Sequence, residues 1–167
     1  MSGVCVWYVA YCKPRLEKTA EENLLRQNYR VRLPLVRKVI RRQVSLEPLF
    51  PRYIFFQPSS DHQSLSPVRS TVGVSSIVRF GMELATLSEE CCDRIMEFAR
   101  AQQEGGLGAL LGVQGIKPGQ KVLVRSGPFA GLEGLVSAVA KDRVLVLMSL
   151  LGKQQPLGFD AIDLSPA

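Results

Sequence analysis

The chain has 167 residues, with 21 Lys and Arg against 15 Asp and Glu, a formal net charge of +6 and a pI near 9.4. This length suits one domain or two small ones, and the charge favours either an anionic partner or a solvated basic face. The basic residues are concentrated between positions 13 and 52, where 11 Lys or Arg stand against 4 Glu. The basic character therefore belongs mainly to the N-terminal part.

Several classes of site and protein are excluded by composition. The four cysteines have no C-x-x-C spacing and His62 is the only histidine, so we expect buried free thiols and no metal site. With no phosphate-loop motif and no nucleophile–base pair, we expect neither an enzyme nor a bound cofactor. No apolar run approaches about 18 residues and no signal segment precedes one, which predicts a cytoplasmic protein without a membrane span.

The first elements are a strand and an amphipathic helix. Val4 to Tyr11 is apolar and rich in β-formers, which predicts a central strand. Pro14 suits the first position of a helix over 14–28, whose apolar face carries Ala20 and Leu24. The other flank of this helix carries polar and basic side chains, with one more just ahead of it: Asn23, Arg26, Gln27 and Lys13.

A basic hairpin and a buried strand follow. Residues 30–35 alternate as a strand and lead into a hairpin rich in Arg and Lys up to Val44. In the strand predicted over 52–57, Tyr53 and Phe55 should face one way and their neighbours the other, with Pro48 and Pro51 at its entrance. Glu47 is the only acid between Glu22 and Asp61, so we expect it to have a cationic partner.

The middle of the chain contains one more strand and a second helix. Residues 58–67 predict a polar loop or short helix, and Val74 to Phe80 a strand. Ser88 can cap a helix over 89–103, with two acids in its first turn. The glycine-rich residues 104–115 are expected to be a linker and domain boundary.

The last third, 116–167, has short strands and Gly-Pro turns at about ten-residue intervals, which predict a small antiparallel barrel. One of its strands is expected from Val144 to Leu147. The longer run from Arg143 to Leu151 is ambiguous, because its valines favour a strand while its leucines and Met148 suit a helix under tertiary pressure.

Four stretches together resemble a known family. Residues 121–136 look like a KOW motif, and residues 7–13, 47–55 and 73–81 resemble the NusG family, most closely its RfaH-type specialised paralogues. The resemblance implies an α+β protein: an N-terminal α/β sandwich of the NGN type over 1–103, a linker over 104–115, and a five-stranded, SH3-like KOW barrel over 116–167. It also implies a transcription elongation and antitermination factor that suppresses pausing and termination.

In this family the N-terminal domain binds RNA polymerase, touching the β′ clamp helices and the β gate loop. The resemblance carries the clamp-helix pocket to Tyr11, Phe50, Tyr53 and Phe55, for which plain core is the competing interpretation. The gate-loop contact is carried only by position to residues 64–67, because the family's His-Thr-Thr-Thr pattern is absent there.

RfaH-type proteins also read the non-template DNA strand. The matching positions are Lys13, Asn23, Arg26 and Gln27, since Lys and Arg attract phosphates and amides can bond base edges. The family pattern has His in place of Asn23 and Arg in place of Val72, so the target sequence is in doubt; Arg69 is a candidate for the missing charge. A solvated basic face without a partner is the alternative.

The resemblance also leaves two states open for the C-terminal domain. In RfaH-type proteins it can fold as an α-helical hairpin over the polymerase-binding pocket, held partly by an ion pair whose positions match Glu47 and Arg143. Gly131, Gly134 and Pro156 disfavour helices, so we expect the barrel as the intrinsic fold and the closed hairpin as the minority alternative.

The family further implies a monomer whose KOW domain couples transcription to translation, with a small-subunit ribosomal protein or Rho as candidate partners. Because ribosomal proteins share the KOW motif, a ribosome-associated or translational RNA-binding protein is the alternative function.

Overall fold

The computed structural model describes residues 5–103, 143–144, 147–148 and 150–151. A five-stranded antiparallel sheet forms its centre, with strand order β2–β5–β1–β6 and with β9 also pairing with β1. Its strands are β1 (Val6–Cys12), β2 (Tyr29–Arg32), β5 (Tyr53–Pro58), β6 (Val74–Ile77) and β9 (Thr86–Ser88). The mixed α/β architecture of the N-terminal part and its central first strand are as the sequence predicts.

Strand β1 lies in the middle because it pairs along both edges. Val9 lies opposite Phe55 on β5, while Ala10 lies opposite Ile77 on β6 and Trp7 opposite Leu87 on β9. The register of β1 and β6 shifts between Tyr11 and Cys12.

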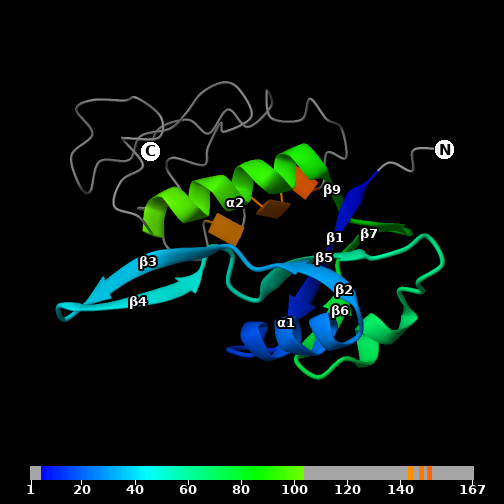
Figure 1. The fold of residues 1–167 in the computed structure, drawn as a ribbon, viewed down its shortest axis with the longest axis horizontal. Coiled ribbons are helices and arrows are strands. Elements are labelled where there is room, and N and C mark those ends of the chain that lie inside the picture. Colours follow the sequence, from blue (N-terminus) through cyan, green and yellow to red (C-terminus); the bar gives the residue numbers. More distant parts are fainter. Residues whose placement is uncertain (1–4, 104–142, 145–146, 149, 152–167) are drawn as a thin grey trace.

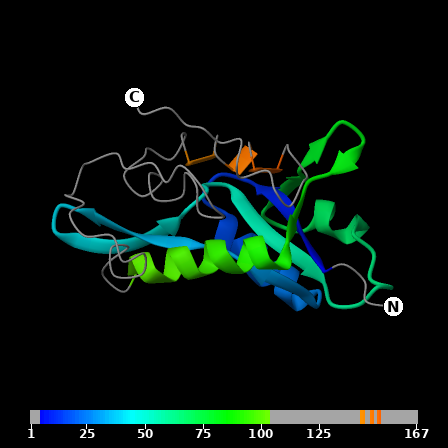
Figure 2. The ribbon, with the colours of Figure 1, turned by 90° about the horizontal axis from the view of Figure 1, so that it is seen from above.

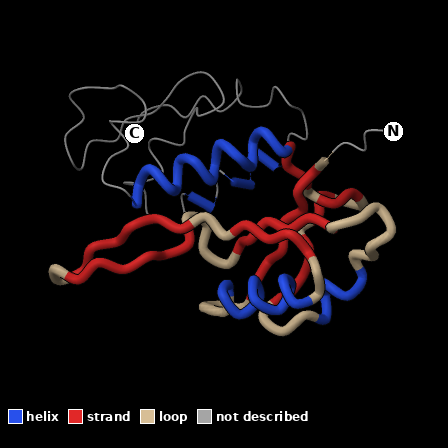
Figure 3. The backbone as a smooth tube through the Cα atoms, viewed as in Figure 1, coloured by secondary structure: helices blue, strands red, loops and turns tan. Residues whose placement is uncertain are grey.

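The alternating side chains of the sheet supply two separate cores, one on each face. Phe55 packs with the residues of α2 (Glu89–Gln103), whereas Ile54 and Phe56 pack with the apolar face of α1 (Glu17–Arg26). Figures 1 and 3 show α1 and α2 on opposite sides of the strands. The predicted alternation of residues 53–56 is therefore confirmed, and it divides the domain into three layers.

Helix α1 is shorter than the predicted span of 14–28. Pro14 is in a turn, because Arg15 next to it has φ 64°, outside the right-handed helical region. Asn28, at φ 68°, ends the C-terminal side in the left-handed conformation that asparagine tolerates. By contrast, α2 begins where predicted, since the Ser88 hydroxyl accepts a hydrogen bond from the Cys91 N–H at 3.1 Å.

Two small hairpins stand apart from the central sheet. Strands β3 (Leu35–Ile40) and β4 (Gln43–Pro48) form a two-stranded ribbon that extends away from the body, past the end of α2 (Figures 1 and 2). The strand predicted from Val74 to Phe80 is interrupted at Val78; β7 (Arg79–Phe80) instead pairs with β8 (Glu83–Leu84). A short 3₁₀ helix, η1 (Ser66–Ser70), ends the polar loop.

Six described residues of the C-terminal third are helical: Arg143, Val144, Leu147, Met148, Leu150 and Leu151. We call them the C-terminal helical residues. The strand predicted from Val144 to Leu147 is therefore wrong at both of those residues, because burial of the leucines outweighs the strand preference of valine. The predicted linker over 104–115 and the other barrel strands lie outside the described residues.

Candidate functional site

The structure brings the four aromatic residues predicted for protein binding to one side of the sheet. Tyr11 and Tyr53 are paired across β1 and β5, with ring centroids 5.0 Å apart. Phe50 and Phe55 meet edge to face at 6.3 Å and are fully buried, while both tyrosines are partly exposed. These four residues form what we call the aromatic patch. Its two tyrosines are partly accessible to solvent, whereas its two phenylalanines also belong to the hydrophobic core.

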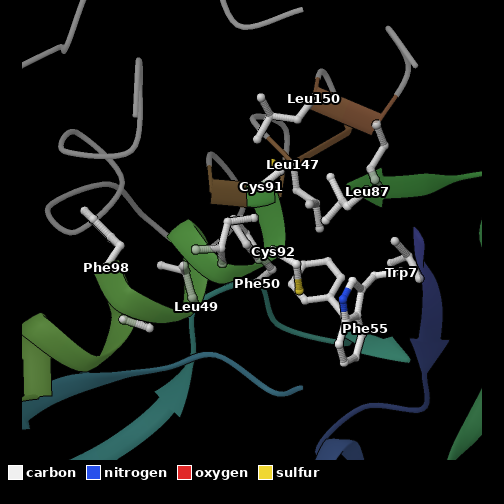
Figure 4. Close-up of a cluster of buried hydrophobic side chains, with 14 of the residues drawn as sticks. Trp7, Leu49, Phe50, Phe55, Leu87, Cys91, Cys92, Phe98, Leu147 and Leu150 are labelled. Carbon is white, nitrogen blue, oxygen red and sulfur yellow. The ribbon is translucent and has the colours of Figure 1, made fainter. Parts of the chain in front are cut away.

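The C-terminal helical residues pack into the same core as the aromatic patch. Leu147 and Leu151 are fully buried and Leu150 is 9% exposed, all in the cluster that contains Phe50 and Phe55. Figure 4 shows Leu147 and Leu150 beside the side chains of α2 and Leu87. A segment distant in sequence therefore covers part of the apolar surface above the sheet.

An ion pair joins the base of the β3–β4 hairpin to this covering segment. Nη2 of Arg143 donates to Oε1 of Glu47 at 2.8 Å, and Nζ of Lys38 lies 3.1 Å from the other carboxylate oxygen. Burial tends to raise the pKa of Glu47, but the hydrogen bonds and charges of Arg143 and Lys38 bring it below its ordinary value. Glu47 was expected to have a cationic partner, and the structure gives it two, Arg143 and Lys38.

Arg52 connects the aromatic patch to α1, a role that sequence reasoning missed. Its guanidinium lies 4.1 Å from the centre of the Tyr11 ring and donates from Nε to the Cys12 carbonyl at 3.0 Å. Its backbone N–H donates to the buried carboxylate of Glu17 at 3.0 Å. Arg52 has φ 75°, and this left-handed turn before β5 is what lets both groups reach α1 and β1.

We call the residues predicted to bind DNA the α1 flank: Lys13, Asn23, Arg26, Gln27 and Arg69. Its two amides already have hydrogen-bond partners within the protein. The Asn23 amide N–H₂ donates to the carbonyls of Thr19 at 2.9 Å and Val72 at 3.3 Å. The Gln27 amide N–H₂ donates to the Asn23 carbonyl at 3.2 Å and to the Thr71 hydroxyl at 2.8 Å. Both amides therefore have only their oxygens left to offer a ligand.

The cations of the α1 flank are exposed. Lys13, Arg26 and Arg69 all face solvent, and none of them forms an ion pair within the part of the chain that the structure describes. The Lys13 backbone N–H donates to the Gly73 carbonyl at 2.8 Å, which fixes the start of the flank against β6. The two guanidinium groups and the ammonium group of these side chains can together attract an anion.

Residues 64–67, which match the gate-loop contact by position, lead into η1 and form its first residues. The Tyr29 hydroxyl donates to the Ser64 carbonyl at 2.5 Å, and Ser66 begins η1. Leu65 lines an open cleft that Tyr8 and Arg30 also line. Residues 64–67 are therefore held against β2 by Tyr29, and an open cleft lies beside them.

A polar network under α2 was not foreseen from the sequence. Trp7 donates from Nε1 to Oε2 of Glu89 at 2.8 Å, and the Arg32 guanidinium lies 4.4 Å from the centre of the indole ring. Arg32 also pairs with Glu89 at 3.2 Å and Asp93 at 2.6 Å. This network fixes the N-terminal end of α2 to β1 and β2.

The described residues contain no group of His, Cys, Asp and Glu side chains arranged to hold a metal ion. Three of the four cysteines, Cys12, Cys91 and Cys92, are buried as free thiols, and burial raises the pKa of Cys12 and Cys92 to about 12. Among the described residues, neither α1 nor α2 is long and apolar enough to span a bilayer.

A family model described as transcription termination factor nusG matches residues 6–96. Among known proteins, the transcription termination/antitermination protein NusG of Thermus thermophilus is 26% identical over 178 residues, covering 92% of this chain and 94% of that protein. The protein of the same name from Deinococcus radiodurans is 31% identical over 123 residues, covering 67% of this chain and 65% of its own. A solved structure described as "Domain interaction in Thermotoga maritima NusG" aligns with 24% identity, a TM-score of 0.47 and 75% coverage of each chain. The family match spans more than half of the sequence, and the chain belongs to the NusG family of transcription termination and antitermination factors.

Proposed function

We propose that this protein is an RfaH-type member of the NusG family, which binds RNA polymerase through the aromatic patch and the non-template DNA strand through the α1 flank, and so suppresses pausing and termination. One observation carries the specialised assignment: three of the C-terminal helical residues, Leu147, Leu150 and Leu151, are buried in the same core as Phe50 and Phe55. A surface that the chain covers with its own distant segment can bind a partner fully only after that segment leaves.

The proposed binding surface has parts of different chemistry, and each part is assigned to a different partner. Tyr11 and Tyr53 offer partly exposed rings, and release of Leu147 and Leu150 would expose more of the apolar surface around Phe50. An aromatic, apolar surface of this kind suits the face of a helical hairpin, so we assign it to the β′ clamp helices. The residues around η1 are assigned to the β gate loop. The free cations of the α1 flank suit the DNA backbone.

In the proposed cycle, the covered form is the free protein. Contact with polymerase and DNA releases the C-terminal segment, which then folds as the five-stranded KOW barrel over 116–167 and becomes available to a small-subunit ribosomal protein or to Rho. Residues 104–115 act as the linker, and the factor works as a monomer in the cytoplasm. No step requires a cofactor, a metal or enzymatic chemistry from this chain.

The buried arginine makes the covered form sensitive to one substitution. Arg143 is 4% exposed, and its paired carboxylate is Glu47. Removal of one partner from a buried ion pair costs about 3–5 kcal/mol, because the other charge stays buried and unpaired. Glu47→Gln should therefore shift the population towards the uncovered form. Since apparent affinity scales with the competent fraction, it should bind polymerase at least about tenfold more tightly than the wild type.

The test measures binding of the full chain to purified polymerase, followed by a pause assay on a template with and without a candidate DNA element. Glu83→Gln, which neutralises an exposed carboxylate on β8, is the matched control and should bind as the wild type does. Tyr11→Ala combined with Glu47→Gln should lose the gain. Equal affinity for wild type and Glu47→Gln, or no effect of any variant on pausing, would overturn the proposal. Copurification with ribosomes instead of polymerase would favour the translational alternative.

A further inference from the structure

Arg52 occupies a position in a turn where glycine is the usual residue. Residues 50–53 form a tight turn, closed by a hydrogen bond from the Tyr53 N–H to the Phe50 carbonyl at 3.0 Å. Arg52 is the third residue of this turn, after Pro51, and has φ 75°. Proline in second place followed by a positive φ in third place is the pattern of a type II turn, whose third residue is normally Gly or Asn. An arginine there is strained, because its Cβ lies too close to the following carbonyl oxygen.

The contacts that Arg52 makes within the protein do not require an arginine. The backbone N–H of residue 52 donates to the Glu17 carboxylate at 3.0 Å and its carbonyl accepts from the Cys12 N–H at 2.7 Å, and a glycine would supply both groups. The side chain adds one hydrogen bond, from Nε to the Cys12 carbonyl, and one cation–π contact with Tyr11. Two partly exposed contacts of this kind are comparable in size with the strain of the turn. Stability of the fold therefore does not explain the choice of arginine.

The end of the guanidinium group has no partner within the protein. Its face lies over the Tyr11 ring, and Nε donates to Cys12. Within the part of the chain that the structure describes, neither Nη1 nor Nη2 of Arg52 forms a hydrogen bond or an ion pair, and the residue is partly exposed. An arginine that is already held by its face and its Nε keeps two coplanar donor groups at its end. This arrangement suits a carboxylate or a phosphate bound through two hydrogen bonds.

The charge of Arg52 lies at the aromatic patch. Tyr11, beneath the guanidinium, pairs with Tyr53 at a centroid distance of 5.0 Å, and both rings are partly exposed. Burial raises the pKa of Tyr53, and the positive charge of Arg52 opposes part of that rise, so the charge also acts on the second tyrosine. A protein that docks on the two tyrosines meets this charge directly, which favours a carboxylate over a nucleic-acid phosphate as its ligand.

We propose that Arg52 is a specificity-determining residue of the aromatic patch, whose Nη1 and Nη2 bind a carboxylate side chain of the protein docked there. The inference rests on the proposed function, in which that protein is RNA polymerase. The ligand is then an Asp or Glu of the β′ clamp helices, next to the apolar side chains that contact Tyr11 and Tyr53. The strain of the turn is the cost of holding a guanidinium group at this place.

The test gives the turn its preferred residue. Arg52→Gly keeps both backbone hydrogen bonds and should unfold at about the same urea concentration as the wild type. At low salt it should bind polymerase about tenfold more weakly, since it loses a charge-assisted, two-point contact. Arg52→Lys keeps the charge without the planar fork, so its affinity should lie between the two. Arg15→Gly is the matched control, because Arg15 is also exposed at a positive φ, 64°, and it should bind as the wild type does.

A salt series separates the ion pair from an indirect effect on Tyr11. Binding of the full chain to purified polymerase is measured without DNA. Loss of an ion pair matters less as salt rises, so the Kd ratio of Arg52→Gly to wild type should fall towards one. A misplaced Tyr11 ring would weaken binding by the same factor at every salt concentration, and a constant ratio would overturn the inference. An equal loss in Arg15→Gly would also overturn it, as would a loss that appears only when DNA is present.

The acidic partner can be located in the polymerase. When each Asp or Glu of the clamp helices is replaced in turn by its amide, one replacement should weaken binding of the wild type and leave Arg52→Gly unchanged. If Arg52→Gly binds like the wild type while Tyr11→Ala binds more weakly, this inference is wrong and the polymerase-binding role of the aromatic patch stands. If the wild type itself does not bind polymerase, both are wrong.

Discussion

Arg143 and Glu47 lie 96 positions apart in sequence, yet Nη2 of the arginine is 2.8 Å from a carboxylate oxygen of the glutamate. The arginine side chain is 5% exposed, and its Nε is buried with no hydrogen-bond partner in the described residues. An arginine held in this way contributes less to the stability of the contact than a fully hydrogen-bonded one. The reason is that one of its donors has lost its hydrogen bond to water and gained no other. The contact joins the two parts of the chain with an incompletely satisfied group.

Acidification should open this contact. The folded pKa of Glu47 is below its ordinary value of 4.5, so its ionised form stabilises the covered state. That contribution is complete above the unfolded pKa and is lost as the pH falls through the lower, folded pKa. Methyl NMR contacts between Leu147 and the core should therefore stay constant from about pH 8 to pH 5.5 and weaken below about pH 4. In Glu47→Gln this acid step should be absent, and a step near neutral pH in the wild type would contradict the assignment.

The two halves of the ion pair should respond unequally to substitution. Glu47→Gln leaves the arginine buried and unpaired, whereas Arg143→Met leaves Glu47 partly exposed and still paired with Lys38. Replacement of a buried charge by an apolar side chain of similar size is often neutral or stabilising. We expect Arg143→Met to remain covered and Glu47→Gln to open, as reported by the same Leu147 methyl signals. Equal opening in both variants would mean that only the attraction between the two charges matters, and that the cost of burying an unpaired arginine does not.

The α1 flank should distinguish bases by their amino groups. Because the amide hydrogens of Asn23 and Gln27 are already donated within the protein, only oxygen acceptors remain to contact a base. On the edge that faces the major groove of a duplex, thymine has only an acceptor and a methyl group. A thymine contacted on that edge should therefore bind several-fold to about a hundredfold more weakly than adenine or cytosine.

Substitution of the Gln27 partner provides the control for base preference. Thr71→Val removes the hydroxyl that accepts from Gln27 and frees one amide hydrogen, which should relax the preference against thymine. Both proteins would be compared on polymerase complexes that differ by one base in the non-template strand. Identical preferences in wild type and Thr71→Val would show that this amide does not read the base.

Gly73 should tolerate no side chain. It has φ +98°, and a Cβ there would lie 2.8 Å from the backbone nitrogen of Ala20 in α1. Gly73→Ala should therefore lower the free energy of unfolding by at least about 2 kcal/mol, from backbone strain and overpacking together. Gly81→Ala is the control: its φ is also positive, but no atom lies within 4 Å, so about 1 kcal/mol is expected. Urea unfolding of both variants would measure the difference, and equal losses would contradict the close approach of α1.

Local patterns predicted the elements that are buried on both faces or capped locally. The alternation of residues 53–56 indicated β5, and Ser88 indicated the start of α2, because each signal lies within a few residues. The start of α1 was missed because the positive φ of Arg15 is set by its surroundings and has no local signal. The helical state of Leu147 depends on a core assembled from β1, β5 and α2, which no local pattern contains.

The residues of the candidate site also divide into those that the sequence predicted and those whose contacts depend on distant parts of the chain. The aromatic patch was predicted from neighbouring residues and a resemblance, and the structure brings its members together. Sequence reasoning treated Asn23 and Gln27 as free amides. Each donates to a backbone carbonyl four residues back on α1 and to a second partner more than 40 residues away, which no local pattern contains. Arg52 was overlooked because its contacts require a left-handed turn that arginine rarely adopts.

Trp7 is the only tryptophan in the protein, and the residue is 1% exposed. It belongs to the core cluster that contains Leu147 and Leu150, and Arg32 lies over its ring. Departure of those leucines would admit water near the indole, and its emission would move to longer wavelength. The chain therefore contains an intrinsic fluorophore that would report the proposed opening, and stopped flow without an attached dye would measure the kinetics of the proposed release on polymerase.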